Sequence, residues 1–318
     1  MAHDHHHHAH SHAAATGKVL LFSLVLTLGF VAIETAAGFR AHSLALLSDA
    51  GHNFTDAFAL LLAAIGFYVQ SRPADHRKTF GYHRAGVLAA FVNAVVLIVL
   101  AGVLFWESYQ RLLHPEPVAE ATMMIIAGVG LALNLGIALG LGGTHGHTHD
   151  VNVHAAWIHM VGDAASSAAI IGGAALIHFT GWLAIDPILS MVIGAGILWS
   201  AWGIVNDSLN ILLEGLPKGL SLASVSNELS VLPGVIDVHD LHIWSLGSNA
   251  HALSCHVLIE DMPPSASDSI LRRVNQTLCD RFDIHHSTIQ FEHIKCALAE
   301  EPCTGQHQHS HTHSHDHV

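Results

Sequence analysis

The chain has 318 residues, of which 51% are hydrophobic and only 12% are charged, and its mean hydropathy is +0.44. Soluble globular domains carry about twice that charged fraction, so the composition excludes an ordinary soluble protein and indicates a polytopic membrane protein with a modest soluble part. The formal charge of −13 depends steeply on pH, because the sequence also holds 31 histidines, 13 of them in residues 1–17 and 297–318.

Six stretches are long and apolar enough for membrane helices. They are Val19–Phe39, Ser43–Val69, Gly86–Leu112, Thr122–Leu141, Val153–Phe179 and Leu183–Asn206. The loop between the second and third stretches carries a cluster of cations, namely Arg72, Arg77, Lys78 and Arg84. The positive-inside rule places that loop in the cytoplasm, and an even number of helices then places both termini there. We expect residues 18–214 to form this membrane domain.

Residues 215–296 have the composition of a small soluble α+β domain that follows a hinge at Gly215 and Pro217. Hydrophobic spacing predicts helices at 220–232 and 265–282, and alternation predicts strands at 235–246, 251–260 and 287–292. The core of so small a domain is marginal alone, so we expect it to pair with a second copy. The four cysteines lie in the last fifth of the chain, and in the cytosol they would be reduced thiols.

One four-residue motif, H-x-x-x-D, occurs in two of the predicted membrane helices. His52 and Asp56 form the first copy, and His159 and Asp163 form the second. Residues i and i+4 share a helix face, about 6 Å apart along the axis. Two such faces turned toward each other would gather two imidazoles and two carboxylates into a tetrahedral nitrogen and oxygen set, which suits zinc.

The charge of this set suggests what it exchanges. An ionised aspartate at membrane depth costs a few kcal/mol if it is unpaired. One divalent cation would neutralise the two carboxylates, and so would one proton on each histidine. We therefore hypothesise a proton/zinc exchanger. The alternative for one motif alone is a hydrogen bond between helices, and two identical motifs make that alternative much weaker.

Three further polar residues lie in the predicted membrane helices: Glu34, Asp49 and Asn93. Asp49 lies three residues before His52, on an adjacent helix face. Each of the three would either guide ions and protons or support helix packing. We favour packing and gating roles for all of them.

Several long motifs occur in an order that resembles the cation diffusion facilitator family, in its zinc-selective branch. They are "SLALLSDAGHNFTD", "RPADHRKTFGYHRAGVLAAFVNA", "HGHTHDVNVHAAWIHMVGDAASS", "LNILLEGLP" and "HDLHIWSL…STIQFE". The resemblance implies an α-helical membrane protein with six transmembrane helices, a C-terminal ferredoxin-like cytoplasmic domain, a homodimer, and proton-coupled zinc efflux by alternating access. The family's transport site matches His52, Asp56, His159 and Asp163, and a histidine at position 52 is the form found in the zinc branch.

The resemblance also implies further metal sites, which this sequence matches only in part. Asp75 matches a loop site of the family, but Lys78 and Tyr82 stand at its histidine positions, so we expect that site to be absent or degraded. The resemblance also implies a metal site in the cytoplasmic domain. Its ligands would be His239, His256, His285 and Glu292, with Cys296 and Cys303 as further candidates. The alternative is that several of these histidines are merely exposed strand residues.

Two other features complete the comparison with the family. Arg84 and Glu214 match a charged pair that joins the membrane dimer to the soluble domain in relatives, although an ordinary interfacial salt bridge is the alternative. The tails, residues 1–17 and 297–318, are rich in histidine, as is the loop that holds His145, His147 and His149. Such segments cannot bury a core. We expect them to concentrate or buffer zinc, and the alternatives are dispensable segments or, at the N-terminus, an expression tag.

Other functions are weighed against transport. A zinc enzyme needs an open ligand position and an acid, as in H-E-x-x-H, and no such sequence occurs, so we expect no enzymatic activity. A metal-sensing or buffering membrane protein without net transport remains the alternative. Four strong ligands would hold an ion too long for a channel. Cadmium or cobalt are possible further substrates, nucleic acid is not expected as a partner, and the short loops suggest a bacterial plasma membrane.

Overall fold

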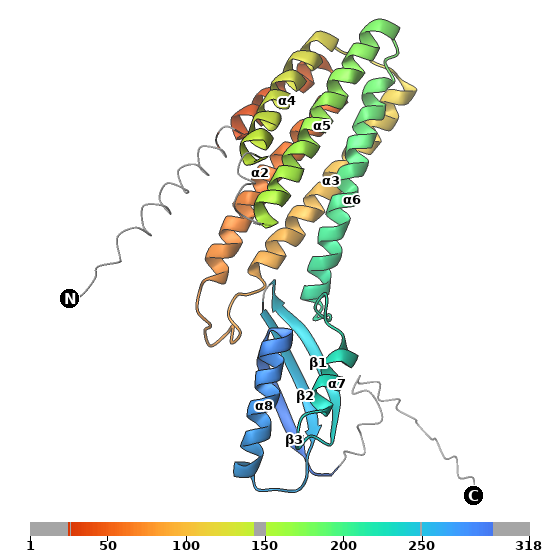
Figure 1. The fold of residues 1–318 in the computed structure, drawn as a ribbon. Coiled ribbons are helices and arrows are strands. Elements are labelled where there is room, and N and C mark those ends of the chain that lie inside the picture. Colours follow the sequence, from red (N-terminus) through yellow and green to blue (C-terminus); the bar gives the residue numbers. More distant parts are fainter. Residues whose placement is uncertain (1–24, 26, 143–150, 249, 295–318) are drawn as a thin grey trace, which may run out of the picture. The chain divides into compact units, whose positions relative to one another are not determined.

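The computed structural model describes residues 25, 27–142, 151–248 and 250–294 (Figure 1). The chain divides into two compact units. The first comprises the chain up to Ser71 together with Leu88–Ser208, and the second comprises Arg72–Val87 together with the chain from Leu209 onward. The predicted domain boundaries after residues 17, 214 and 296 stay predictions.

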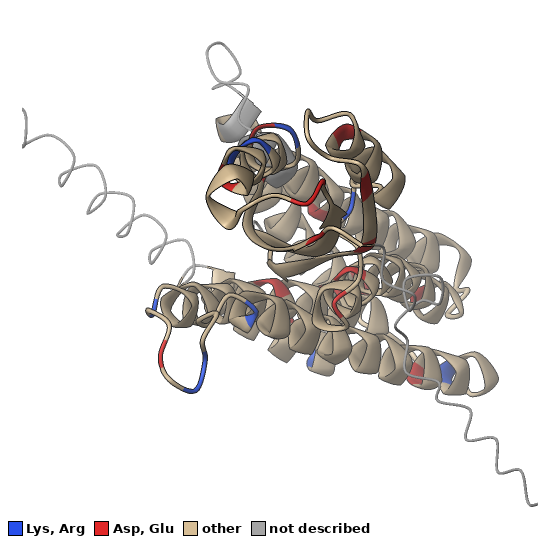
Figure 2. Cartoon of the chain, turned by 90° about the horizontal axis from the view of Figure 1, so that it is seen from below, with Lys and Arg blue, Asp and Glu red and all other residues tan. Residues whose placement is uncertain are grey.

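The first unit is a bundle of long apolar helices. A helix at residues 27–41 precedes α2 (Leu44–Gln70), α3 (Ala85–Leu113), α4 (Glu120–Gly142), α5 (Val151–Thr180) and α6 (Ile185–Leu212). At about 1.5 Å per residue, even the shortest of α2–α6 exceeds the roughly 30 Å of a bilayer core. Within the described residues, five helices are long and apolar enough to cross a membrane. In Figure 2 most of the ribbon of these helices is tan, and few positions are coloured as lysine or arginine.

These helices confirm the predicted α-helical membrane fold, with small differences in their bounds. Predicted and observed ends agree to within a few residues for α2 to α5. The last helix is longer than predicted, because it continues from Asn206 to Leu212 through a polar segment that hydropathy alone excludes. The first predicted span, Val19–Phe39, lies partly outside the described residues.

Small residues allow the helices of this unit to pack closely. One buried cluster joins the start of α2 with α4, α5 and α6, and a second joins α3 with α6. The first includes Ala41, Ala45, Met123, Ala127, Ile170 and Ala174, and the second includes Ala94, Leu97, Ala101, Ile197 and Ala201. Without a hydrophobic driving force inside a bilayer, such close contact is the main source of helix association.

The N-terminus of α2 is held by a buried acid from α6. Ser43 occupies the N-cap, and its hydroxyl accepts a hydrogen bond from the Leu46 amide at 3.2 Å. Asp186 accepts hydrogen bonds from the Ser43 hydroxyl at 2.6 Å and from the amides of Leu44 at 2.7 Å and Ala45 at 3.3 Å. A carboxylate at this end satisfies unpaired amides and complements the helix dipole. The contact therefore fixes where α2 begins.

The second unit contains a small α+β fold. Its elements are α7 (Leu222–Ser230), β1 (Asp237–Gly247), β2 (Ala250–Leu258), α8 (Pro264–Phe282) and β3 (Ile284–Glu292). The sheet order is β1-β2-β3, with β1 antiparallel and β3 parallel to β2, so α8 is the crossover connection. The core lies between the sheet and the two helices, and includes Val225, Leu229, Leu253, Val257, Ile270, Val274 and Leu278. The predicted order of helices and strands is confirmed.

The loop that precedes α3 also belongs to this unit and packs against the end of β1. A Cβ added at Gly247 would lie 2.7 Å from the carbonyl oxygen of His83, so only glycine fits there without a shift of the backbone. Phe80 of the same loop meets the ring of His286 edge to face, with 5.0 Å between ring centroids. These contacts tie the loop to the sheet.

Candidate metal centres

The two H-x-x-x-D motifs lie on α2 and α5, and the structure brings them together. His52 and Asp56 are one helical turn apart on α2, and His159 and Asp163 are one turn apart on α5. One ligand atom from each of the four side chains lies within 4.8 Å of the others. The two imidazole rings meet edge to face, with 5.9 Å between centroids.

Each histidine faces both acids through its Nε2 atom. His52 Nε2 lies 3.6 Å from Asp56 Oδ2 and 3.4 Å from Asp163 Oδ1. His159 Nε2 lies 3.2 Å from Asp56 Oδ2 and 3.5 Å from Asp163 Oδ2. The two nitrogens and the two carboxylates thus alternate around one point, and every acid contacts the histidine of the other helix as well as that of its own.

These distances match the edges of a small tetrahedron. Zinc binds imidazole nitrogen and carboxylate oxygen at about 2.0–2.2 Å, which sets ligand atoms about 3.3–3.5 Å apart around a tetrahedral ion. The four nitrogen–oxygen distances run from 3.2 to 3.6 Å. Asp163 meets His52 through Oδ1 and His159 through Oδ2, so the four distances are compatible with one dication between the side chains but do not define a single set of four ligand atoms.

The group is neither sealed nor fully exposed. The Asp163 side chain is 7% exposed, whereas that of His159 is 42% exposed. The four side chains therefore differ in exposure, from the buried Asp163 to the half-exposed His159.

Three buried polar residues belong to the same helical unit, and their packing or gating roles stay predictions. Asp49, 2% exposed, accepts a hydrogen bond from the Ser166 hydroxyl at 2.6 Å. Glu34 is fully buried and accepts one from Asn53 at 3.2 Å. These bonds join α2 to α5 and to the first helix. Asn93 is also buried in α3, and within the described residues its side-chain oxygen has no hydrogen-bond partner.

A second group of ligands lies on the sheet. Glu292 of β3 places Oε2 3.1 Å from His239 Nε2 and Oε1 3.1 Å from His256 Nδ1, and all three residues qualify as ligands of one ion. Asp240 adds an oxygen 3.6 Å from His256 Nε2. Burial alone would raise the pKa of Glu292, but hydrogen bonds from Gln290 and His239 and the charges of the two histidines lower it. The acid therefore stays ionised between them.

The structure does not bring the other predicted cytoplasmic ligands to this group. His285 lies at the opposite end of β3 from Glu292. Seven residues of strand separate their Cα atoms by about 23 Å. Its partners are Cys279 and Asp283. Cys296 and Cys303 lie outside the described residues, as do His145, His147 and His149.

Asp75 is engaged in holding its own loop. Its Oδ1 accepts hydrogen bonds from the amides of Lys78 at 2.8 Å and Arg77 at 2.7 Å, and its Oδ2 accepts one from the Tyr82 hydroxyl at 2.9 Å. These bonds lower the pKa of Asp75, the bonds from Lys78 most, and the bond to Asp75 raises the pKa of Tyr82. Lys78 and Tyr82 occupy the two positions at which the resemblance implies histidines, and the loss of that loop site stays a prediction.

Arg84 and Glu214 are also brought together. One guanidinium nitrogen of Arg84 lies 3.2 Å from Glu214 Oε1 and donates to the Ser245 carbonyl at 3.3 Å. The arginine thereby links the loop before α3, the segment that follows α6 and strand β1.

Reasoning from the sequence missed two residues that position the site and its helices. Asp186 caps α2 across 142 positions of chain, and Ser166 holds Asp49 across 117 positions. A buried-acid signal existed for Asp186, because an acid in an apolar run needs a partner. For Ser166, the signal was its place three residues after Asp163, on the same face of α5.

Comparison with known proteins identifies the family. Residues 20–213 match the model of the cation efflux transmembrane domain, and residues 217–294 match that of the cation efflux protein cytoplasmic domain. The chain is 38% identical over 299 residues to the zinc transporter ZitB of Escherichia coli strain K12, covering 93% of this chain and 94% of that protein. It is 36% identical over 293 residues to the cadmium, cobalt and zinc/H(+)-K(+) antiporter of Bacillus subtilis strain 168, covering 92% of each.

Two further relatives come from Cupriavidus metallidurans. The metal cation efflux system protein CzcD is 38% identical over 299 residues, which cover 94% of this chain and 92% of that protein. A solved structure, the metal-bound C-terminal domain of the CzcD transporter, is 42% identical and covers 23% of this chain and 99% of that one, with a TM-score of 0.21. The chain is thus a multi-pass membrane protein that belongs to the cation efflux family, also called the cation diffusion facilitator family, of metal transporters.

Proposed function

We propose that this protein exports zinc from the cytoplasm in exchange for protons, with the ion held by His52, Asp56, His159 and Asp163. The observation that carries the proposal is the set of four nitrogen–oxygen distances between α2 and α5, which match the edges of a tetrahedral zinc site. The names of relatives as zinc, cadmium and cobalt transporters support the same class of substrate. Cadmium and cobalt are included in the proposal as further substrates.

The charge of the four side chains explains how zinc transport would be coupled to proton transport. Two carboxylates and one dication sum to zero, and two carboxylates and two imidazolium groups also sum to zero. Either state is compatible with a site at membrane depth, whereas the empty and unprotonated state leaves two unbalanced charges. The site therefore favours a return step in its protonated form, which is the chemical basis of antiport.

The sheet group is proposed as a second, cytoplasmic zinc site. His239, His256 and Glu292 provide three ligands with suitable spacing, and a fourth position is left for water or another side chain. An ion there would stiffen the sheet between β1 and β3. The match to a dimerising cytoplasmic domain supports a homodimer. In that dimer, the stiffness of the soluble domain would depend on the zinc concentration of the cytoplasm. The bacterial relatives support a plasma membrane as the site of action. The cations of the loop between α2 and α3 support cytoplasmic termini.

A second candidate function follows from the same sheet group. A membrane protein that only senses or buffers zinc would also need His239, His256 and Glu292, but it would move no ion. The two candidates differ in net flux, so a flux measurement separates them.

The test is zinc uptake into inside-out membrane vesicles with an acidic lumen. We expect saturable uptake that requires the proton gradient and is lost in Asp163→Ala. Glu107→Gln is the matched control, because it removes an exposed acid from α3 whose salt bridge with Arg111 is worth little. Uptake that survives in Asp163→Ala, or that is independent of protons, would contradict the proposal. Absence of any flux in the wild type would favour the sensor.

A further inference from the structure

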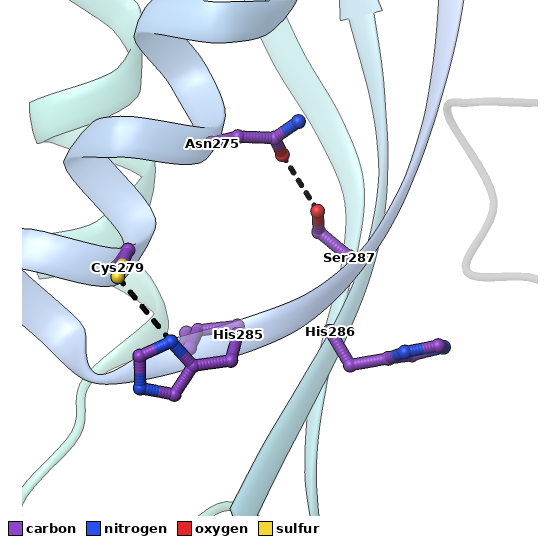
Figure 3. Close-up of a pocket in the computed structure, with 6 residues that line it drawn as sticks. Asn275, Cys279, His285, His286 and Ser287 are labelled. Atoms are coloured by element: carbon purple, nitrogen blue, oxygen red, sulfur yellow. Dashed lines mark hydrogen bonds between the residues drawn. The ribbon is translucent and has the colours of Figure 1, made fainter.

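A thiol, an imidazole and a carboxylate meet where α8 ends and β3 begins. Cys279 Sγ is 3.3 Å from His285 Nδ1, and the other ring nitrogen of His285, Nε2, is 2.8 Å from Asp283 Oδ1. Figure 3 shows the thiol and the imidazole facing each other across this corner. Neither of the two groups described above contains sulfur, so this cluster offers a different chemistry.

The local backbone creates this arrangement. Asp283 is the C-cap of α8 and adopts a left-handed conformation, with φ of 55°, while its amide donates to the carbonyls of Cys279 and Leu278. Few residues other than glycine adopt this conformation readily, and aspartate is one of them. The turn reverses the chain within one residue. The side chains at positions 279, 283 and 285 therefore converge, although they belong to a helix, a cap and a strand.

The aspartate determines which histidine nitrogen is available. An ionised carboxylate only accepts hydrogen bonds, so Nε2 of His285 carries the proton and donates it to Asp283. The lone pair of Nδ1 then points at Cys279 Sγ. A histidine whose far nitrogen is bound to a carboxylate is the usual arrangement around a protein-bound metal, because the carboxylate orients the ring and makes it more basic.

The sulfur–nitrogen distance also suits a shared ion. Zinc binds thiolate at about 2.3 Å and imidazole at about 2.0–2.1 Å, which separates the two atoms by about 3.6 Å around a tetrahedral ion. The observed 3.3 Å requires only a small outward movement. Beside the pair lies an open pocket of about 430 Å³, where the remaining ligand positions would be filled by water.

The other side chains of the pocket are not needed as ligands. The Ser287 hydroxyl donates to Asn275 Oδ1 at 2.6 Å, so these two satisfy each other. The ring of His286 points away from Cys279 in Figure 3. The ligand set is therefore one thiolate and one imidazole.

We propose that Cys279 and His285 bind a thiophilic divalent cation, Zn²⁺ or Cd²⁺, with Asp283 as the positioning residue. The thiol loses its proton to solvent as the sulfur–metal bond forms, and the imidazole donates its lone pair without losing a proton. Two protein ligands and an open pocket make the ion exchangeable. Sulfur favours cadmium at this site more than at the nitrogen and oxygen sites of this protein.

The test is a cadmium titration of the detergent-solubilised full-length protein in which Cys296 and Cys303 are replaced by serine. The cadmium–thiolate bond has an ultraviolet charge-transfer band that ligands without sulfur do not produce, so the membrane site and the sheet group are silent. Burial raises the pKa of the Cys255 thiol to about 12, which keeps that core residue out of the signal. We expect the absorbance of this band to saturate at one bound cadmium ion per chain. We also expect cadmium to protect Cys279 from alkylation by iodoacetamide.

Variants assign the signal to the proposed ligands. The band should disappear in Cys279→Ser and weaken strongly in His285→Gln, and Asp283→Asn should raise the cadmium dissociation constant about tenfold or more. His286→Gln is the matched control, because it removes the neighbouring imidazole that points away, and it should titrate like the parent. A band that persists in Cys279→Ser, or a parent protein without band and without alkylation protection, would overturn the proposal. Alkylation protection is measured on the parent protein, so the test does not depend on the variants folding.

Discussion

Asp163 of α5 lies 3.4 Å from His52 of α2, so the acid of one helix reaches the imidazole of the other. Its second oxygen lies 3.5 Å from His159, on its own helix. Asp163 is the most buried of the four proposed ligands. It bridges both histidines, and a change at this residue affects both halves of the site.

Asp163→Asn should weaken zinc binding by more than tenfold, because the site would keep a net positive charge when the ion is bound and the amide is a poorer ligand than a carboxylate. The measurement is calorimetric zinc titration of the purified protein with His239, His256 and Cys279 replaced by alanine, in which the high-affinity phase is compared between Asp163→Asn and its parent, because weak binding by the histidine-rich tails is the same in both. Glu107→Gln in the same background should bind zinc like its parent. An unchanged zinc affinity in Asp163→Asn would exclude this acid as a ligand.

Asp186→Ala should lower thermal stability, because the Ser43 hydroxyl and the amides of Leu44 and Ala45 would lose their acceptor inside the bundle. Each buried donor left unpaired costs about 1–3 kcal/mol. The thermal stability of Asp186→Asn should lie between those of the wild type and Asp186→Ala, since asparagine keeps one acceptor oxygen. Thermal unfolding in detergent measures the effect. Equal stability of all three proteins would show that the cap does not support α2.

The pair formed by Tyr82 and Asp75 predicts a pH window. The bond raises the pKa of Tyr82. Its contribution to folding stability is therefore present below the ordinary tyrosine pKa of about 10 and is lost as pH rises through the higher pKa of the folded state. The same loop lowers the pKa of Asp75, so this contribution is present above about pH 4 and is lost as pH falls through the lower folded-state value.

The measurement for this pair is a spectrophotometric titration of tyrosinate. In Asp75→Asn, one of the three tyrosines should ionise at lower pH than in the wild type, whereas Tyr82→Phe should remove that difference. If the wild type and Asp75→Asn give the same titration curve, the hydrogen bond does not form in solution.

Gly247→Ala should loosen the contact between β1 and the loop before α3, because the added Cβ would lie 2.7 Å from the His83 carbonyl oxygen. Forcing a methyl group into such a contact costs about 1–3 kcal/mol. Ser248→Ala, the exposed neighbour, is the matched control. Denaturant unfolding of the full-length protein, followed by tryptophan fluorescence, should show a loss of stability of the second unit for Gly247→Ala alone. A variant as stable as the control would contradict the contact.

Much of the fold could be predicted because its signals are local. An apolar run of about 20 residues predicts a membrane helix, and alternation predicts the strands of the soluble domain. The two H-x-x-x-D motifs also carry their own geometry, since i and i+4 share a helix face. The positions of His52 and His159 therefore needed only one further assumption, that the two faces meet.

Other features could not be predicted because they depend on distant partners. The sequence does not indicate that Asp186 meets Ser43, 143 residues away. His285 was expected beside Glu292, but strand β3 runs continuously between them and holds them apart. Conversely, the turn at Asp283 brings His285 to Cys279, and nothing in the residue types alone predicts that left-handed cap.

The central claim is that four side chains in the membrane helices bind one dication, and X-ray absorption at the zinc edge tests it most directly. The sample is the protein with His239, His256, Glu292 and Cys279 replaced by alanine, with the histidines of residues 1–17, 145–149 and 297–318 replaced by serine, and with one equivalent of zinc added. The account predicts a first shell of nitrogen and oxygen alone, at about 2.0–2.2 Å, which is lost when His52 and Asp163 are also replaced. An ion that keeps the same shell after those replacements, or a shell that contains sulfur, would contradict it.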